Sequence, residues 1–452
     1  MKPEILRIPP RLWAVATVTG AGAFMAMLDT SVANLALLPL QENFRTSLGD
    51  VQWVVTGYLI ALAVSMPMTG WLCRRFGHGR VWQMSMTGFV AASALCALSE
   101  TSLMLSLARG LQGLAAGIMV PSGQAVLASV SERRQLGRLM GTVGFAVALG
   151  PALGPGVGGV LTETVSWRGL FWMNVPIGAV AIVAGRYLVP AGDGKPSSRL
   201  DAKGVLLCAV GFPLVLFGLA EISTANINWQ ALVNVFLGGV FLNWALRHFR
   251  HVDAPLINLA LFSRPGFAGA AATAGLTGAA MYSGLLLFPI YLQVELNFGD
   301  IETGGMLLVM GLGAAIALPF AGYLTDRYGP AAVSGSGAVL LLLGTLPFGV
   351  WPIWAASPIA ALLCLRGIGL ALAQMPAMTA AFTVVQEMET GDAATLVNVV
   401  QRVGGALGAT AMVLVIELGG TTQNGALAFP LLILLAAGPV LTSFWLRPAG
   451  RT

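Results

Sequence analysis

Apolar stretches of about twenty residues recur along almost the whole chain and constrain its fold more than any other feature. The hydrocarbon core of a bilayer is about 30 Å thick, and a helix needs about 20 apolar residues to cross it. Only 10% of the 452 residues are charged and 56% are hydrophobic, whereas a soluble domain has about 25% charged residues. Because the apolar stretches are continuous and do not alternate with polar residues, they predict helices and not the strands of a membrane barrel. We therefore predict an all-α polytopic membrane protein.

Fourteen of these stretches are long enough to be transmembrane helices. They lie at about 12–40, 51–73, 80–100, 102–131, 136–162, 166–189, 202–222, 228–248, 265–295, 302–324, 330–349, 355–386, 393–417 and 427–446. The first stretch carries Asp29 and is longer than a secretory signal, so we expect it to remain in the mature protein. The four cysteines have no spacing typical of a metal site or of a disulfide framework. We expect no metal and no cofactor.

The lysine and arginine residues between these stretches fall mostly on one side of the membrane. If the amino terminus is cytoplasmic, the outer side receives only Arg45 and Arg168. Cytoplasmic loops of membrane proteins carry the excess of Lys and Arg, and an even number of spans returns the carboxyl terminus to the same side. We therefore predict a multi-pass protein of a bacterial inner (cytoplasmic) membrane with both termini in the cytoplasm. This topology explains the formal charge of +5 without a nucleic-acid partner.

The sequence contains an internal repeat. The segment Gly70–Gly77 reads GWLCRRFG and Gly322–Gly329 reads GYLTDRYG, while Arg109 and Arg366 are each followed by a glycine and later by a proline. Because charged residues inside membrane helices are rare, the similar offsets indicate two parallel copies of a six-helix unit. The predicted domains are an N-terminal six-helix bundle at 1–190, a cytoplasmic linker at 191–201, an extra transmembrane helix pair at 202–250 and a C-terminal six-helix bundle at 251–452.

Two ionisable residues lie inside the predicted spans of the first half. Asp29 is in the middle of the first span, where an ionised carboxylate costs at least about 2.5 kcal/mol, and a protonatable group exposed to each side in turn can carry a proton. Arg109 lies several residues inside the fourth span, with Gln112 on the same helix face, and needs a carboxylate or carbonyl partner. Asp29 is the first candidate partner. The alternatives are a carboxylate satisfied by Thr30 and Asn34 and an arginine bound only to backbone carbonyls.

Glycines and arginines mark further candidate positions for conformational change. In the fifth span, glycines three and four residues apart and a proline predict a bent, flat face that allows close helix crossing. After the second span, Gly77 and Gly79 permit left-handed backbone, and the neighbouring arginines can face lipid headgroups or a helix end. The candidate residues are Gly70, Arg74, Arg75, Gly77, Arg80, Gly150, Gly154, Pro155, Gly158, Gly159, Asp326 and Arg327. Helix packing alone and a simple positively charged loop are the alternatives.

Together these stretches resemble the major facilitator superfamily, and in particular its fourteen-helix drug:proton antiporter family of the multidrug efflux type, over essentially the whole chain. The segments that carry the resemblance are LDTSVANLALLP, GWLCRRFGHGR, LARGLQG, the Gly150–Gly159 run and WRGLFWMNVPIG. The resemblance implies alternating access between two halves, export driven by the proton gradient, and a proton-coupling site at Asp29 with Arg109 beside it. Arg74 stands where the family usually has an acid, whereas Asp326 keeps that acid in the second half. The departure argues against a charge-pair latch in the first half.

A central cavity between the halves is the expected substrate site. The candidate lining residues are Asn34, Tyr58, Gln112, Met119, Tyr282, Tyr291, Gln374, Met375, Met378, Asn398 and Gln401. Methionine and aromatic side chains adapt their packing, so such a wall suits varied amphipathic molecules; simple packing between helices is the alternative. Glu221, Glu295 and Glu417 fall near outer helix ends, which favours neutral or singly charged substrates. Glu221 and Glu295 are further candidate acids for entrance or coupling.

The resemblance, together with these residues, implies a proton-coupled antiporter that exports amphipathic drugs or toxic small molecules from the cytoplasm. The alternative is a carrier for one metabolite or lipid, in which Arg109, Arg366 and Arg402 would bind a carboxylate or phosphate. A non-transporting membrane sensor is a third hypothesis. No cluster of nucleophile, base and orienting residue indicates an enzyme. The expected partners are the substrates, protons and membrane lipid, and the sequence leaves a periplasmic adaptor protein open.

Overall fold

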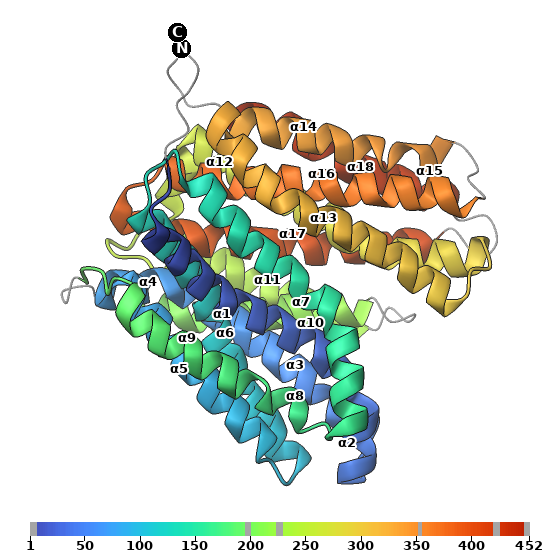
Figure 1. The fold of residues 1–452 in the computed structure, drawn as a ribbon, viewed down its shortest axis with the longest axis horizontal. Helices are drawn as coiled ribbons and strands as arrows, with labels where there is room; N and C mark the ends of the chain where they lie inside the picture. Colours follow the sequence, from blue (N-terminus) through green and yellow to red (C-terminus); the bar gives the residue numbers. More distant parts are fainter. Residues whose placement is uncertain (1–6, 195–199, 223–228, 351–354, 419–424, 447–452) are drawn as a thin grey trace.

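The structure is a computed structural model that describes residues 7–194, 200–222, 229–350, 355–418 and 425–446. These residues form helices joined by short connections, and no strand occurs among them. Figure 1 shows the helices running across the molecule in two groups. The predicted all-α fold is confirmed.

The helices of the first half and of the following pair alternate with short turns. They are α1 (Pro10–Leu35), α2 (Leu37–Phe44), α3 (Leu48–Ser65), η1 (Met66–Met68), α4 (Thr69–Phe76), α5 (His78–Ala97), α6 (Ser102–Val130), α7 (Leu136–Thr164), α8 (Gly169–Trp172), α9 (Asn174–Leu188), α10 (Ala202–Ile222) and α11 (Trp229–Phe249). The second half contains η2 (Leu259–Ser263), α12 (Pro265–Ile290), η3 (Tyr291–Glu295), α13 (Asp300–Tyr328), α14 (Pro330–Leu343), α15 (Leu346–Val350), α16 (Ala356–Thr383), η4 (Glu387–Glu389), α17 (Thr390–Leu418), α18 (Gly425–Ser443) and η5 (Phe444–Leu446).

Each of the fourteen predicted spans coincides with a helical segment. Among the described residues, 12 segments have the length and hydropathy to cross a membrane. The other two predicted spans correspond to α5, which begins with the polar sequence HGR, and to α7, whose apolar stretch is Leu136–Gly150. Several spans are interrupted where the helix changes type or direction, for example at Ala36 and at Pro67 of η1. Proline removes a backbone donor and explains the second interruption.

Large apolar side chains cover the outside of the helix bundle. Leu103 and Phe236 each expose 70% of their surface and Ile301 exposes 92%. In α11 only 17% of the most apolar window is buried inside the protein. Water-soluble proteins rarely expose contiguous apolar surface on this scale, whereas the lipid hydrocarbon requires it. The chain is therefore a multi-pass membrane protein.

The helices pack as two groups that meet along one seam. In the first group α1 packs on α7 and α3 on α6, and in the second group α12 packs on α17 and α14 on α16. The groups contact each other through α7 and α13 and through α17 with α4 and α6. Figure 1 shows the groups meeting at the left and diverging toward the right. The α10–α11 pair packs together, and α10 also contacts α3 and α17.

Arginines gather at the end where the groups meet, which we call the basic end. It is formed by the α4–α5, α6–α7, η2–α12 and α13–α14 connections and carries Arg74, Arg75, Arg80, Arg138, Arg264 and Arg327. Its turns repeat between the halves: Gly77 ends α4 with φ 89° and ψ 146°, and Gly329 ends α13 with φ 84° and ψ 156°. A side chain would be strained in this conformation. The shared backbone geometry supports the internal repeat.

The prediction for Gly79 was wrong. Gly79 lies in the first turn of α5, and only Gly77, Gly192 and Gly329 among the described glycines have positive φ. The backbone of Pro190 approaches Gly79 so closely that a Cβ would strike it. The backbone amides of Gly79 and Arg80 also donate to Ala191 O, at 3.1 and 3.2 Å. Close approach of the linker, and not a left-handed turn, explains this glycine.

Candidate functional site

Asp29 of α1 is buried inside the first helix group, with 1% of its surface exposed. Arg109 Nη1 of α6 forms an ion pair with Asp29 Oδ2. Gln112 Nε2 of α6 and Asn174 Nδ2 of α9 each donate a hydrogen bond of 3.0 Å to Asp29 Oδ1. The predicted contact between Asp29 and Arg109 is present, and donors from two helices hold the carboxylate.

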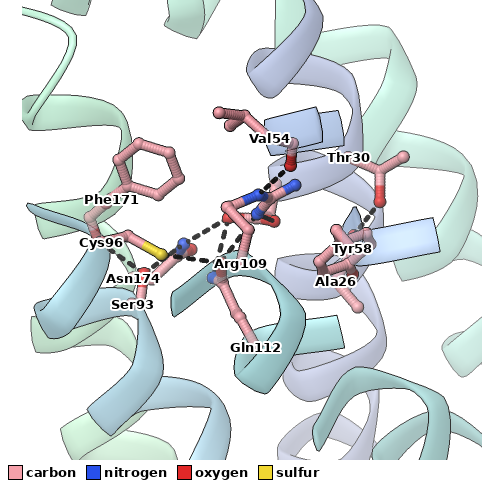
Figure 2. Close-up of polar contacts among 11 residues, drawn as sticks. Ala26, Thr30, Val54, Tyr58, Ser93, Cys96, Arg109, Gln112, Phe171 and Asn174 are labelled. Atoms are coloured by element: carbon pink, nitrogen blue, oxygen red, sulfur yellow. Dashed lines mark hydrogen bonds and ion pairs between the residues drawn. The ribbon is translucent and has the colours of Figure 1, made fainter. Parts of the chain in front are cut away.

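The guanidinium of Arg109 is fully buried and is fixed from several directions (Figure 2). Nε donates to Val54 O at 3.0 Å, and Nη1 also donates to Gln112 Oε1 at 2.7 Å. Its Cζ atom lies 4.2 Å from the ring centroid of Tyr58 and 5.6 Å from that of Phe171, within the range of cation–π attraction. Arg109 therefore binds a carboxylate and a backbone carbonyl together, and the alternative of an arginine bound only to backbone carbonyls was wrong.

The hydrogen-bond network extends to residues that the sequence analysis did not select. Asn174 Nδ2 donates to Ser93 Oγ at 3.1 Å, and Ser93 Oγ donates to Phe171 O at 2.9 Å. The Cys96 thiol donates weakly to Gln112 Oε1 at 3.6 Å. Asn174 stands inside the WRGLFWMNVPIG segment, so an uncharged amide within an apolar span was the available signal. Its contact with Asp29 joins residues 145 positions apart, which no local pattern indicates.

Two polar atoms of this site have spare hydrogen-bonding capacity. Arg109 Nη2 and Asn174 Oδ1 are buried and have no hydrogen-bond partner among the described atoms. Buried polar groups are nearly always paired, and unpaired ones mark places where a proton, water molecule or ligand can enter. The charges of the site are therefore balanced, but one donor nitrogen and one acceptor oxygen are left without a hydrogen bond among the described atoms.

The second half keeps the buried cation but not the acid. Arg366 of α16 is fully buried, donates through Nη2 to Ala280 O at 2.6 Å and through Nη1 to Thr345 Oγ1. No carboxylate in the described part of the chain pairs with it. Gly284 of α12 faces its guanidinium, and a Cβ at Gly284 would lie 3.1 Å from Arg366 Cζ. The two halves are thus related in fold but differ in the chemistry of their buried arginines.

An ion pair joins the two groups at the basic end. Arg74 of α4 pairs with Asp392 of α17, and Arg74 Nη2 donates to Pro255 O at 3.3 Å. A Cβ at Gly70 would strike the Asp392 carboxylate, so this glycine leaves room for the pair. The expectation for the first half was wrong: Arg74 replaces the usual acid, but it pairs with an acid from the other half.

A second ion pair closes the same end from the other half. Asp326 Oδ2 of α13 accepts from Arg138 Nε at 2.8 Å and from Arg138 N at 3.2 Å. Asp326 Oδ1 accepts from Gly137 N at 2.9 Å. A carboxylate at the first turn of a helix satisfies free amides and complements the helix dipole. Asp326 therefore caps α7 across the seam, whereas Arg75 is half-buried, Arg80 is exposed and Arg327 lies beside Tyr323 and Tyr328.

The glycine-rich run of α7 packs against α1. A Cβ at Gly150 would lie 2.6 Å from Met27 Cβ, and one at Gly154 would lie 2.6 Å from Ser31 Cβ. Gly158 lies further along the same helix, and the side-chain surroundings of Pro155 and Gly159 fall outside the described residues. The close crossing brings α7 against the helix that carries Asp29.

Some predicted cavity residues lie between the halves. Asn398 Nδ2 of α17 donates to Gln124 Oε1 of α6 at 2.7 Å. Met375 of α16 approaches α7, with Sδ 3.3 Å from the Cβ position of Gly144. Tyr282 and Gln401 instead lie in the contact between α12 and α17 inside the second group, at the Cβ positions of Gly405 and Gly278, and Gln374 is half-buried. The side chain of Asn34 is outside the described residues.

Other predicted cavity residues are placed inside a helix group instead. Met119 is 1% exposed and packs where Gly22 leaves space, whereas Met378 is buried in an apolar cluster that includes residues of both groups. Tyr291 packs edge-on against Phe348 and Phe429, with ring centroids 5.9 and 5.0 Å away. Tyr58 and Gln112 belong to the Asp29 site.

The further candidate acids lie away from Asp29. Glu221 Oε2 of α10 accepts from Asn234 Nδ2 of α11 at 3.4 Å. Glu295 is exposed at the end of η3. Glu417 has no described side-chain surroundings. Glu221 therefore belongs to the contact between the extra helices.

Comparisons with known proteins agree with this architecture. The family model for the Major Facilitator Superfamily matches residues 19–409. A relative from Mycobacterium tuberculosis, the Multidrug resistance protein B homolog, is 32% identical over 415 residues, which cover 90% of this chain and 76% of that protein. The Putative multidrug resistance protein MdtD of Escherichia coli is 32% identical over 341 residues, covering 75% and 71% of the two chains.

A solved structure shows the same fold at low sequence identity. The human organic anion transporter MFSD10 (TETRAN) matches with a TM-score of 0.68 and 16% identity, covering 97% of this chain and 100% of that one. At this identity the likeness concerns the arrangement of helices. The family model covers most of the chain, and the chain therefore belongs to the major facilitator superfamily.

Proposed function

We propose that this transporter is a proton-coupled antiporter that exports amphipathic drugs or other toxic small molecules from the cytoplasm by alternating access. Transport itself follows from membership of the superfamily. The observation that supports coupling is the Asp29 carboxylate, buried inside a membrane helix and paired with Arg109. The proton gradient is the energy source in this proposal.

The contacts of Asp29 suit a carboxyl group that gains and loses a proton. In the ionised form its charge is balanced by Arg109 and its Oδ1 accepts two amide hydrogen bonds. Protonation removes the charge that holds Arg109, so the guanidinium must seek other partners or move. The unpaired Asn174 Oδ1 can accept a hydrogen bond from a protonated carboxyl group. A proton on Asp29 thereby changes the contacts between α1, α6 and α9.

The two groups of helices are the moving parts in this proposal. We assign them to the six-helix bundles at 1–190 and 251–452, with the extra pair at 202–250 beside them. The pairs Arg74 with Asp392 and Arg138 with Asp326 hold the basic end closed, and the helix groups diverge away from it (Figure 1). If the basic end is cytoplasmic, as the positive-inside rule favours, the two groups are joined at their cytoplasmic ends in this arrangement. A state that is open at these ends requires both ion pairs to break.

The substrate class rests on the relatives and on the side chains between the halves. The two relatives described above are named as multidrug resistance proteins. Met375 contributes polarizable surface near the seam, and Tyr282 packs on Gly405 of α17 in the second group. Such side chains adapt to molecules of different shape, which suits amphipathic compounds. We place the protein in a bacterial inner membrane with both termini in the cytoplasm.

The test measures proton movement in proteoliposomes that hold a pH gradient and a pH-sensitive dye, while a panel of amphipathic compounds is added. The native chain should give compound-dependent proton flux, and Asp29→Asn should abolish it because the amide cannot bind the proton. Asn is close in size to Asp, so the site keeps its volume. Asp253→Asn, which removes an exposed carboxylate near the basic end, is the matched control and should behave as the native chain.

Two results separate the alternatives. Compound flux with unchanged proton movement in Asp29→Asn would refute coupling at Asp29. In that case Glu221→Gln identifies whether the acid between α10 and α11 carries the proton instead. Compound flux without proton movement in the native chain would indicate a facilitator.

A further inference from the structure

A further arginine within a candidate membrane span, besides Arg109 and Arg366, lies near the middle of α17. Arg402 is far from both ends of this helix, which runs from Thr390 to Leu418. Its side chain is half-buried. A charged residue at this depth is costly unless it faces the interior of the bundle and finds a counter-charge. The direction and partners of Arg402 therefore decide its role.

The packing of α17 shows which way Arg402 points. Gly404 and Gly408 press α17 against α12, with Cβ positions 2.8 Å from Gly275 Cα and 2.7 Å from Ala279 Cα. An α-helix advances about 100° per residue, so Arg402 lies about 160° around the helix from Gly404. Asn398, one turn earlier and on the same face as Arg402, donates to Gln124 of the first group. Arg402 therefore faces the first half across the seam.

The Asp29 site lies on the opposite side of that seam. The Tyr58 ring of α3 covers the Arg109 guanidinium at 4.2 Å, and α17, which carries Arg402, packs against α6, which carries Arg109. Tyr58 is fully buried in the first group. A group bound at Arg402 would therefore lie across the α6–α17 contact from the proposed proton-coupling site.

The charges in this region do not balance. Asp29 neutralises Arg109, whereas Arg366, inside the second group, has no carboxylate partner among the described residues and donates only to Ala280 O and Thr345 Oγ1. Arg402 makes no hydrogen bond or ion pair with any residue that the structure describes, although each guanidinium offers five donors. An anion from outside the protein can supply the missing charge, and a planar guanidinium favours carboxylate, sulfonate and phosphate oxygens.

We infer that Arg402 binds the anionic group of the transported molecule, so that amphipathic acids are the preferred substrates. This inference rests on the proposed function and narrows its substrate class from amphiphiles in general to those with an acidic headgroup. The apolar body of the acid lies along the seam, and its charged group meets Arg402. Outward movement of such an anion is also favoured by a membrane potential that is negative inside.

The test compares 2-naphthoate with 2-naphthamide, which share an apolar ring system and differ in charge. Binding of each probe to purified protein in lipid nanodiscs is measured by titration calorimetry. The native chain should bind naphthoate about tenfold more tightly than naphthamide, the value of one charge-assisted hydrogen bond. Arg402→Gln should weaken the binding of naphthoate alone and bring the ratio of the two dissociation constants near one. Arg402→Lys should keep part of the preference for naphthoate.

The matched control is Arg247→Gln, which removes an exposed arginine near the basic end of α11 and should leave the ratio unchanged. Equal binding of the two probes by the native chain would overturn the inference without any variant. A preference for naphthoate that persists in Arg402→Gln would overturn it as well. Loss of proton flux through Asp29 is a separate readout, so failure of the proposed function is distinguishable from failure of this inference.

Discussion

At the scale of single residues, Arg109 makes contacts that another cation cannot reproduce. Its Nε binds Val54 O, its Nη1 binds Asp29 and Gln112, and its flat face lies on Tyr58. A lysine ammonium carries the same charge on a single nitrogen and has no planar face. The planar geometry of the guanidinium group, and not its charge alone, holds the carboxylate in position.

This difference gives a prediction for Arg109→Lys. The variant should remain folded because the charge of Asp29 stays balanced, but proton-coupled transport should fall at least about tenfold, since a charge-assisted hydrogen bond of about 1.5–3 kcal/mol is lost. Arg109→Ala leaves a buried carboxylate unpaired and should lower the free energy of unfolding by roughly 3–5 kcal/mol. Flux in proteoliposomes and thermal unfolding in detergent measure the two effects. If Arg109→Lys transported at the native rate, the planar guanidinium group would not be required.

At the scale of helices, glycine positions decide which faces can meet. In α6, a Cβ at Gly113 would strike Tyr58 O and lie 3.0 Å from Tyr58 Cα of α3. A Cβ at Gly110, in the same helix, would meet nothing within 4 Å. The sequence LARGLQG does not distinguish the two glycines, because only the neighbouring helix does.

We expect Gly113→Ala to destabilise the protein by about 1–3 kcal/mol because it overpacks the α3–α6 contact. Gly110→Ala should be neutral or stabilise the helix by up to about 1 kcal/mol, since glycine in a helix interior costs backbone entropy. Thermal unfolding of both variants in the same detergent compares the two sites. Equal losses of stability would contradict the close approach of α3 and α6.

Helix positions were predictable from the sequence, whereas the contacts between helices were only partly so. Run length and hydropathy placed α6, observed at Ser102–Val130, at 102–131, because the bilayer thickness fixes the length. The Asp29 and Arg109 contact followed from the cost of burying each charge alone. Asn174 and the Arg74 partner Asp392 did not follow, because they depend on neighbours 145 and 318 positions away. Met119 was wrongly predicted to line the cavity. The rotation of α6 about its axis turns this side chain toward Gly22 of α1, and the sequence does not give that rotation.

At the scale of the whole molecule, the proposed cycle requires the basic end to open. A Cβ at Gly391 of α17 would lie 2.8 Å from Cys73 Cβ and 3.4 Å from Cys73 Sγ of α4. Disulfides need Cβ atoms about 3.5–4.5 Å apart, so a small shift of the helices lets Gly391→Cys bond to the native Cys73. The bond would fasten the two halves beside the Arg74 and Asp392 pair.

Oxidised Gly391→Cys should therefore lose transport, and dithiothreitol should restore it. The control combines Gly391→Cys with Cys73→Ser, which cannot form the bond and should transport equally with and without oxidant. Mass spectrometry of the intact protein reports the fraction crosslinked. Native transport by fully crosslinked protein would exclude opening at the basic end.

The most direct test of the account separates coupling from movement in Asp29→Asn. Two assays use the same proteoliposomes: exchange of labelled for unlabelled substrate without a pH gradient, and uphill accumulation of substrate driven by a pH gradient. If Asp29 carries the proton, the variant should retain exchange and lose gradient-driven accumulation, while the native chain performs both. Gradient-driven accumulation by Asp29→Asn at the native level would contradict the central claim.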